Sequence, residues 1–152
     1  GVKKSNLRQL ARQRLEARGG RCRCIRCREA GLLHVTEADV SLKHERYQAA
    51  GGEEHFLSYE AEDGTLVGFL RLRLSAEARV RELHIYGPML PIGSRAEGWQ
   101  HRGYGERLVT AAEGLAADAG YSRLHVTSGI GARGYYRRLG YELFGPYMVK
   151  AI

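Results

Sequence analysis

Long apolar stretches are missing from this 152-residue sequence. No run approaches the roughly 20 apolar residues that span a bilayer, and the first residues lack the apolar core of a secretion signal. Internal repeats and low-complexity tracts are also missing. With 43% hydrophobic and 27% charged residues, the composition is that of an ordinary globular protein. We therefore expect a globular chain with no membrane partner and a cytoplasmic location.

Cysteine is scarce, and its three copies fall in one short stretch: Cys22, Cys24 and Cys27. An odd number at such close spacing makes a poor disulfide framework and favours a metal-ligand cluster, with Zn²⁺ as the expected ion. The surrounding arginines would lower the pKa of these thiols. The fourth ligand stays open, because His34, His44, His55 or a residue of another domain or chain would serve. Three surface thiols without a metal are the alternative.

Acidic residues are almost missing from the first 28 positions, where ten Lys and Arg stand against Glu16 alone, for a net charge of +9. The rest of the chain holds 14 basic and 16 acidic residues, so it is nearly neutral. A basic segment on a neutral body fits contact with nucleic acid, because each phosphate that Lys or Arg neutralises releases counterions. A solvated helix face, or a docking surface for an acidic neighbour, would explain the same charge.

The basic segment also contains a helical pattern. Residues 5–18 predict a helix that Gly19-Gly20 ends, and Leu7, Leu10 and Leu15 form its narrow apolar stripe. A helix with so little apolar surface and so many arginines is expected to lie outside the core.

From residue 40 onward apolar and polar residues alternate with a period of two, which is typical of strands. Strands are expected from 40, over 55–62, 65–74 and 80–86, and then over 121–127 and 141–150, with a hairpin turn at Asp63-Gly64. A longer helix is expected over 106–119, ended by Gly120, and a shorter one over 135–139. Residues 1–30 thus form a basic helix with a cysteine loop, and residues 31–152 form an α+β domain with a mixed sheet and helices on its faces.

The loop Gln100-His101-Arg102-Gly103-Tyr104-Gly105 stands before the longer helix. The first turn of a helix has backbone N–H groups without intrahelical partners and the positive end of the helix dipole, so it attracts phosphate. Gly103 and Gly105 would remove side chains that hold a ligand away. A glycine-containing loop that only turns the chain is the alternative.

Gln-x-x-Gly-x-Gly after a strand and at the start of a helix resembles the pyrophosphate-binding loop of the GNAT acyltransferases, which use acetyl-CoA. Over essentially its whole length the chain is similar to the acetyltransferase domain of the elongator complex protein 3 family. That similarity rests on the cysteine loop, Arg-Glu-Leu-His-Ile-Tyr-Gly at 81–87, the 100–105 loop, the glycine- and tyrosine-rich 129–141 segment and Gly-Pro-Tyr-Met-Val-Lys at 145–150.

In that family the domain follows a radical-SAM domain, and the two together add an acetyl-derived group to C5 of wobble uridine 34 in tRNA. The resemblance therefore implies tRNA and the radical-SAM domain as partners. SAM and the [4Fe–4S] cluster would belong to that second domain, since the cysteine spacing does not match the radical-SAM motif. No radical-SAM half is present in the 152 residues. We expect a domain of a longer enzyme, or a shortened relative, limited by itself to binding or hydrolysing acetyl-CoA.

The resemblance also implies which residues hold acetyl-CoA. Backbone N–H groups from Arg102 through Gly103 and Tyr104 to Gly105 would bind the pyrophosphate, and Gln100 and His101 would make further contacts. The strand end His84-Ile85-Tyr86 would offer its edge to the pantetheine amides, and Gly87 would let two strands diverge. A bend without function is the alternative explanation for that glycine.

Tyr135 and Tyr136 are the expected acid and positioning pair at the sulfur of acetyl-CoA. A phenol with a pKa of about 10 is protonated at neutral pH and can donate its proton to a thiolate. Which tyrosine donates stays open, and adjacent tyrosines are otherwise often one core ring and one surface ring. Glu82, on the same strand face as His84 and Tyr86, is the candidate base for amine acetylation, with a solvated glutamate as the alternative.

Three functions follow from these observations. The first is an acetyl-CoA-using domain of a tRNA-modifying enzyme. The second is an independent acetyltransferase of protein lysine, which the same architecture would fit. The third is a zinc-stabilised RNA-binding module whose acyl site has decayed, against which the complete 100–105 loop and the tyrosine pair argue.

Overall fold

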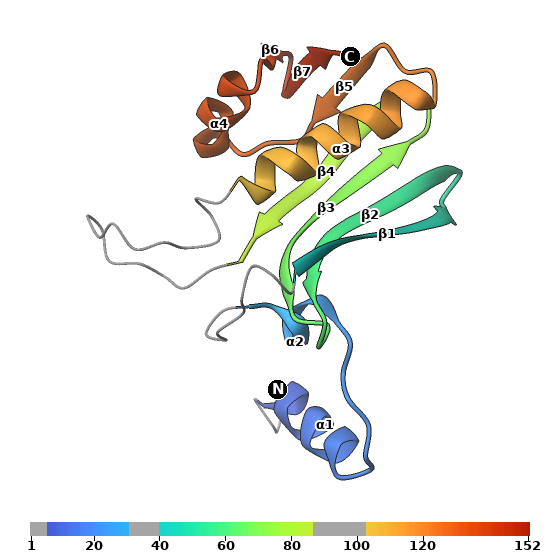
Figure 1. Ribbon diagram of the computed structural model, residues 1–152, viewed down its shortest axis with the longest axis vertical. Helices are drawn as coiled ribbons and strands as arrows, with labels where there is room; N and C mark the ends of the chain where they lie inside the picture. Colours follow the sequence, from blue (N-terminus) through green and yellow to red (C-terminus); the bar gives the residue numbers. More distant parts are fainter. Residues whose placement is uncertain (1–5, 31–39, 87–102) are drawn as a thin grey trace, which may run out of the picture.

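The computed structural model describes residues 6–30, 40–86 and 103–152. Its elements run in the order α1 (Leu7–Glu16), α2 (Ile25–Arg28), β1 (Val40–Ala49), β2 (Gly52–Ala61), β3 (Leu66–Leu74), β4 (Ala78–Ile85), α3 (Tyr104–Asp118), β5 (Arg123–Val126), the 3₁₀ turn η3 (Ile130–Ala132), α4 (Arg133–Arg138), β6 (Glu142–Phe144) and β7 (Tyr147–Ala151). Figure 1 shows the strands side by side with α3 lying across them.

The seven strands form one sheet in the order β1-β2-β3-β4-β5-β7-β6. β1 to β4 are an antiparallel meander, β4 and β5 are parallel, and β5, β7 and β6 are again antiparallel. The chain reaches the parallel strand through α3, as a parallel pair requires a long crossover. The predicted mixed sheet is therefore confirmed.

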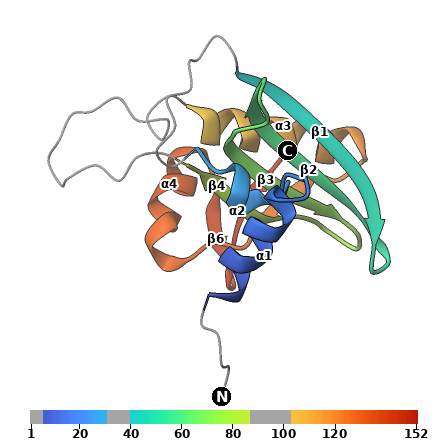
Figure 2. The same cartoon turned by 90° about the horizontal axis from the view of Figure 1, so that it is seen from below.

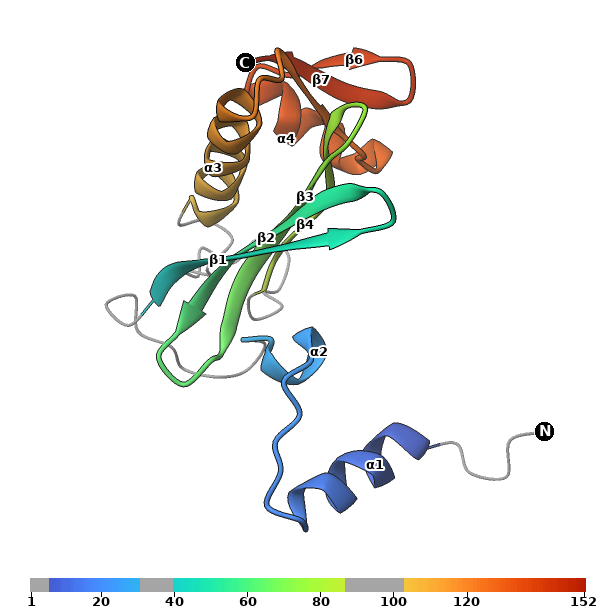
Figure 3. The ribbon, with the colours of Figure 1, turned by 90° about the vertical axis from the view of Figure 1, so that its right-hand side faces the viewer.

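The hydrophobic core lies between α3 and the sheet. Leu108, Val109, Ala112 and Ala116 of α3 are buried against leucines and valines of β2 to β5, together with Tyr136, Tyr141 and Met148. Burying apolar surface of this kind contributes roughly 25 cal/mol per Å². Figure 3 shows α3 on one side of the sheet and α2 on the other.

The amino-terminal region meets the sheet through α2, while α1 contributes no buried residue. Arg28 forms a 2.8 Å ion pair with Glu60 of β2, and the Ala30 amide donates to the Leu66 carbonyl at 2.9 Å. Ala30 also packs in a small core with Val67 and Tyr104, so packing is continuous across the predicted boundary at residue 30. Figures 1 and 3 show α1 apart from the sheet, and in the view from below it lies in the foreground (Figure 2). The expected position of α1 outside the core is confirmed.

One predicted strand is wrong. Residues 141–150 were expected to be continuous, but the structure divides them into β6 and β7, which pair as a hairpin. The reason is the turn at Gly145-Pro146, where Gly145 has φ 57°, a left-handed conformation that glycine adopts without strain. The predicted cap is confirmed, since Gly120 follows α3 with φ 86° and the Tyr121 amide donates to the Ala116 carbonyl.

Among the described residues, no helix has the length and apolar character that crossing a membrane requires.

Candidate active site

Each of the two glycines at the start of α3 is required for a different structural reason. Gly103 caps the helix with φ 75°, a left-handed backbone conformation that residues with a Cβ rarely adopt. Gly105 has ordinary helical geometry, but a Cβ there would lie 2.8 Å from the Tyr135 hydroxyl and 3.6 Å from Cγ1 of Ile85. The helix therefore begins at Tyr104, two residues before the predicted start. The absence of a side chain at Gly105 leaves space that Tyr135 approaches from α4.

β4 contains a bulge at Arg81. Arg71 of β3 pairs with Glu82 and Leu72 pairs with Val80, so β4 has one extra residue at this point. A bulge shifts the alternation of side chains by one position. Ala78 and Val80 face the core before the bulge, and Leu83 and Ile85 face it afterwards.

Beyond the bulge, β4 and β5 separate. They pair only from Ala78 to Val80, and the last hydrogen bond between them within the described chain runs from the Thr127 amide to the Val80 carbonyl at 3.0 Å. The divergence predicted at Gly87 thus begins seven residues earlier, while Gly87 itself lies outside the described residues. The remaining part of β4 has a backbone edge turned toward the gap.

A cavity of about 650 Å³ opens where the strands separate. Its walls come from the end of β4, the first turn of α3 and the start of α4, and they consist of Leu83, Ile85, Gly103, Gly105, Glu106, Ala132, Tyr135 and Tyr136. This volume lies within the range typical of small-molecule sites, and the lining is mainly apolar with a few polar groups, as such sites require.

Tyr135 and Tyr136 contribute to this cavity in different ways. Tyr136 is buried, with its ring edge-on to Tyr135 at 5.2 Å and to Tyr141 at 5.8 Å, and burial raises its pKa to about 12. Burial also raises the pKa of Tyr135, with a further effect from Glu106. The Tyr135 hydroxyl is buried and has no hydrogen-bond partner among the described residues. A buried hydroxyl without a partner is costly unless a ligand supplies one.

The polar residues predicted on β4 lie on the other face of the sheet from this cavity. Glu82 contacts Arg71, with 3.4 Å between Oε2 and Nη1. His84 stacks on Phe69 at 5.1 Å and on Tyr86 at 6.4 Å. The predicted shared face is confirmed, but the bulge turns it away from the tyrosine pair. Leu83 lines the cavity instead and was not predicted, because an unpredicted bulge reverses the alternation of β4. Glu106 of α3 and Ala132 of η3 also line it and were not predicted.

Of the predicted phosphate loop, Gly103, Tyr104 and Gly105 are described, whereas Gln100, His101 and Arg102 lie outside the described residues. Tyr104 is buried, with its ring edge-on to Tyr59 at 4.6 Å. Its side chain therefore helps to fix the first turn of α3 on the sheet.

The three cysteines are close together, with their sulfur atoms within 4.8 Å of one another. The pKa of Cys24 is lowered to about 7, chiefly by hydrogen bonding with the Cys22 thiol and with a smaller contribution from the charge of Arg8. The pKa of Cys22 is raised, contrary to the prediction: a backbone hydrogen bond with Cys24 lowers it, but thiol hydrogen bonds with Cys24 and Cys27 and burial outweigh that effect. Arg8 Nη2 lies 3.3 Å from the Cys27 sulfur and 3.7 Å from the Cys24 sulfur. Three thiols at these separations fit part of a tetrahedral zinc site.

Two of the proposed fourth ligands lie elsewhere. His44 Nε2 is 2.9 Å from His55 Nδ1, and His55 Nε2 is 2.9 Å from Glu53 Oε1. The two imidazoles therefore bond each other across β1 and β2 and do not join the cysteine group. His34 lies outside the described residues.

Comparison with known proteins decides the family. Residues 25–141 match the acetyltransferase (GNAT) family. The chain belongs to the GNAT family. It is 45% identical to the Elongator complex protein 3 of Danio rerio and 44% identical to the tRNA uridine(34) acetyltransferase of Dehalococcoides mccartyi, with 99% and 97% of this chain aligned. It spans only 31% and 36% of those two proteins, about a third of their length.

A solved structure has the same fold over the whole chain. The archaeal Methanocaldococcus infernus Elp3 with an amino-terminal deletion matches with a TM-score of 0.86 and 41% identity, covering 100% of this chain and 40% of that one. The GNAT fold predicted from the sequence is confirmed, and so is the family resemblance that motivated it.

Proposed function

We propose that the cavity between β4, α3 and α4 binds acetyl-CoA, and that this GNAT domain belongs to an enzyme that modifies wobble uridine 34 of tRNA. The single observation behind the proposal is the position of the cavity at the amino-terminal end of α3, beside an unpartnered tyrosine hydroxyl. Relatives named tRNA uridine(34) acetyltransferase support the choice of tRNA. The radical-SAM domain is then a further partner, which would supply SAM and the [4Fe–4S] cluster.

The residues present fit acetyl-CoA. The first turn of α3 offers helix-dipole and backbone N–H groups to the pyrophosphate, and Gly103 places no side chain over them. The backbone edge of β4 beyond Val80 would bond the pantetheine amides, and Leu83 and Ile85 would pack against its methylenes. Acetyl-CoA supplies a two-carbon unit activated as a thioester.

Tyr135 is the proposed proton donor. Its raised pKa keeps the phenol protonated at neutral pH, and within the described part of the chain its hydroxyl lacks a partner, which a sulfur atom in the cavity would supply. Burial raises the pKa of Tyr136 to about 12, and its ring contacts on both sides suit it to position Tyr135. Proton transfer to the departing thiolate lowers the barrier to thioester cleavage.

The lysine acetyltransferase alternative is not supported. Glu82, its candidate base, contacts Arg71 on the face of the sheet away from the cavity. The curated relatives at 41–45% identity are named for Elongator or for tRNA uridine(34) acetylation. We therefore do not retain Glu82 as a catalytic base.

Calorimetric titration with acetyl-CoA tests the proposal. We expect saturable binding that a Gly103→Glu substitution weakens at least tenfold, because the carboxylate and the strained backbone would both oppose phosphate binding. Gly114→Glu, in the exposed middle of the same helix, is the matched control and should bind normally. Equal affinities for both variants, or no binding by the wild type, would contradict the proposal.

A further inference from the structure

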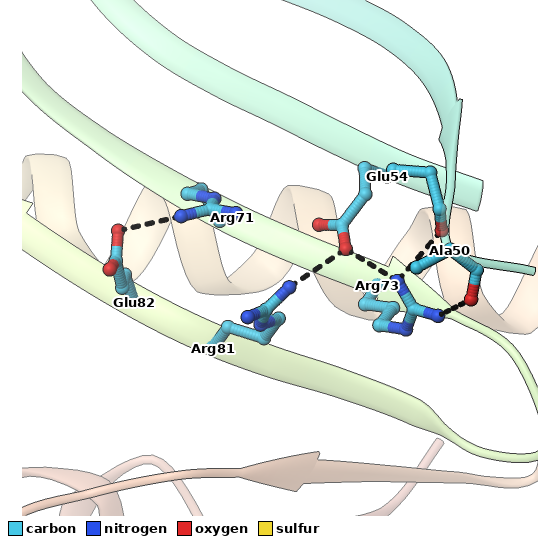
Figure 4. A network of polar contacts seen from close by, with 7 residues as sticks. Ala50, Glu54, Arg71, Arg73, Arg81 and Glu82 are labelled. Carbon is cyan, nitrogen blue, oxygen red and sulfur yellow. Dashed lines mark hydrogen bonds and ion pairs between the residues drawn. The ribbon is translucent and has the colours of Figure 1, made fainter. Parts of the chain in front are cut away.

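Two ion pairs hold the β4 bulge from the face of the sheet opposite α3. Arg81 Nη1 lies 2.9 Å from Glu54 Oε1 on β2, and Glu82 Oε2 lies 3.4 Å from Arg71 Nη1 on β3. Figure 4 shows Arg81 and Glu82 as neighbours on β4 that reach to two different strands. The extra residue of the bulge is thus fixed by its own side chain.

Glu54 is a rigid anchor for this contact. Its side chain is 2% exposed, and the same Oε1 accepts a 2.8 Å hydrogen bond from Arg73. Arg73 in turn donates to the carbonyls of Ala49 and Ala50, at 3.0 and 2.8 Å, in the β1–β2 turn. A buried carboxylate between two guanidinium groups has little freedom to move, so it holds Arg81 in one place.

The bulge matters because it decides which β4 side chains enter the cavity. If β4 continued without the extra residue, the alternation of Ala78 and Val80 would bring Glu82 and His84 to the face of α3. With it, Leu83 and Ile85 face that side and line the cavity. One extra residue therefore exchanges two polar side chains for two apolar ones in the wall of the site.

We infer that Glu54 and Arg81 are positioning residues for the acyl-CoA site: their ion pair, on the opposite face of the sheet, fixes the bulge and so places Leu83 and Ile85 in the cavity wall. Neither residue touches the cavity. The inference rests on the proposed function, since an effect on acetyl-CoA requires that this cavity be its site.

Arg81→Met tests the inference. In this variant Glu54 keeps Arg73 as a partner, so the buried ion pair between Arg73 and Glu54 remains. The matched control is Arg79→Met. Arg79 lies two residues earlier on the same strand, where it pairs with Glu77 and stacks on Tyr147, but it is outside the bulge.

Small misplacements of groups that bind substrate strongly lower catalytic efficiency. We expect acetyl-CoA affinity to fall roughly tenfold in Arg81→Met. It should stay within about twofold of wild type in Arg79→Met and in the conservative variant Arg81→Lys.

The methyl resonances of Leu83 and Ile85 give a second, ligand-free readout by NMR. They should shift in Arg81→Met and stay in place in Arg79→Met. Unmoved methyl groups in Arg81→Met would overturn the inference, whatever the affinity, and normal wild-type binding would then leave the proposed function standing. Failure of the wild type to bind acetyl-CoA would overturn the proposed function. The methyl shifts alone would then show whether the ion pair between Glu54 and Arg81 fixes the position of the bulge.

Discussion

Gly103 and Gly105 stand two positions apart at the start of α3, yet a side chain is unfavourable at each for a different reason. At Gly103 a side chain meets nothing within 4 Å, so only the left-handed backbone at φ 75° opposes it. At Gly105 the backbone is helical, and the opposition comes from Tyr135 across the cavity. This Gly-x-Gly motif therefore combines a conformational requirement at its first glycine with a steric requirement at its second. The sequence alone does not show which glycine meets which requirement.

Alanine at Gly105 should destabilise the protein by about 1–2 kcal/mol, because its Cβ forces Tyr135 to move. Gly114→Ala in the same helix meets open space and should stabilise by up to about 1 kcal/mol. Denaturant unfolding measures both. Adding Tyr135→Phe removes the nearest contacting atom, so the loss from Gly105→Ala should shrink in that background. An undiminished loss in the double variant would place the strain elsewhere.

Tyr135→Phe should also lower the rate of acetyl-CoA cleavage by roughly 10²-fold at unchanged acetyl-CoA affinity, because proton transfer acts on the transition state. Tyr136→Phe removes a hydroxyl with a pKa of about 12 and should have a smaller effect on the rate. Single-turnover release of CoA thiol, with affinity measured in parallel, separates the two variants. The opposite ranking would assign the donor to Tyr136.

Among the elements, β4 shows how far the sequence predicts this site. The period of two places the strand correctly and predicts that Glu82, His84 and Tyr86 share a face. It does not show which face, because the bulge depends on contacts of Arg81 with Glu54 in β2 and of Glu82 with Arg71 in β3, which are 27 and 11 residues apart in the chain. Helices α1, α3 and α4, the mixed sheet, the cysteine cluster and the tyrosine pair depend on local pattern or on the family motif, and these were predictable. The short helix α2 lies in a stretch that was predicted as a loop.

The Glu54 contacts predict an acid-sensitive link between β2, β3 and β4. Burial favours the neutral acid, but hydrogen bonds from Arg73 and Arg81 outweigh it and hold the pKa of Glu54 below its usual 4.5. A lowered folded-state pKa contributes stability that is present above the unfolded value and lost as pH falls through the folded value. Wild type should therefore lose unfolding free energy below about pH 4.5 relative to Glu54→Gln.

At neutral pH the difference is largest, because Glu54→Gln leaves two guanidinium groups without their carboxylate. We expect it to be less stable than wild type by about 3 kcal/mol. Urea unfolding from pH 7 to pH 3 measures both effects. A constant difference between the two proteins across that range would show that Glu54 has an unshifted pKa.

The cysteine cluster predicts that the segment around α2, a helix with no buried residue, binds zinc. Each Cys→Ser substitution should lower Zn²⁺ affinity by at least about tenfold, because one thiolate ligand is lost. His44→Gln should leave the affinity unchanged, since His44 bonds His55 and lies outside the cysteine group. Zinc titration against a coloured chelator compares the variants. Weakened binding in His44→Gln would make that histidine the fourth ligand.

At the scale of the whole molecule, charge and chemistry are segregated. The first 28 residues hold a net charge of +9 around α1 and the cysteine loop, whereas the cavity lies between α3, α4 and the end of β4. α1 packs no residue into the core. Arg8 contacts the cysteines and Arg12 pairs with Glu16, while Arg14 is exposed to a partner. If that partner is tRNA, the body supplies acyl chemistry while the basic segment supplies affinity.

Neutralising two exposed arginines of the basic segment, Arg14 in α1 and Arg18 just after it, tests this division. Arg14→Gln with Arg18→Gln should weaken tRNA binding and reduce the slope of log affinity against log salt by about 1–2, because fewer counterions are released. The matched control removes two exposed charges from the body, with Lys43→Gln and Arg123→Gln. Filter binding at several salt concentrations gives both slopes. Acetyl-CoA affinity should be normal in both double variants. Equal slopes for the two double variants would mean that net charge alone attracts tRNA, and that α1 is not its binding element.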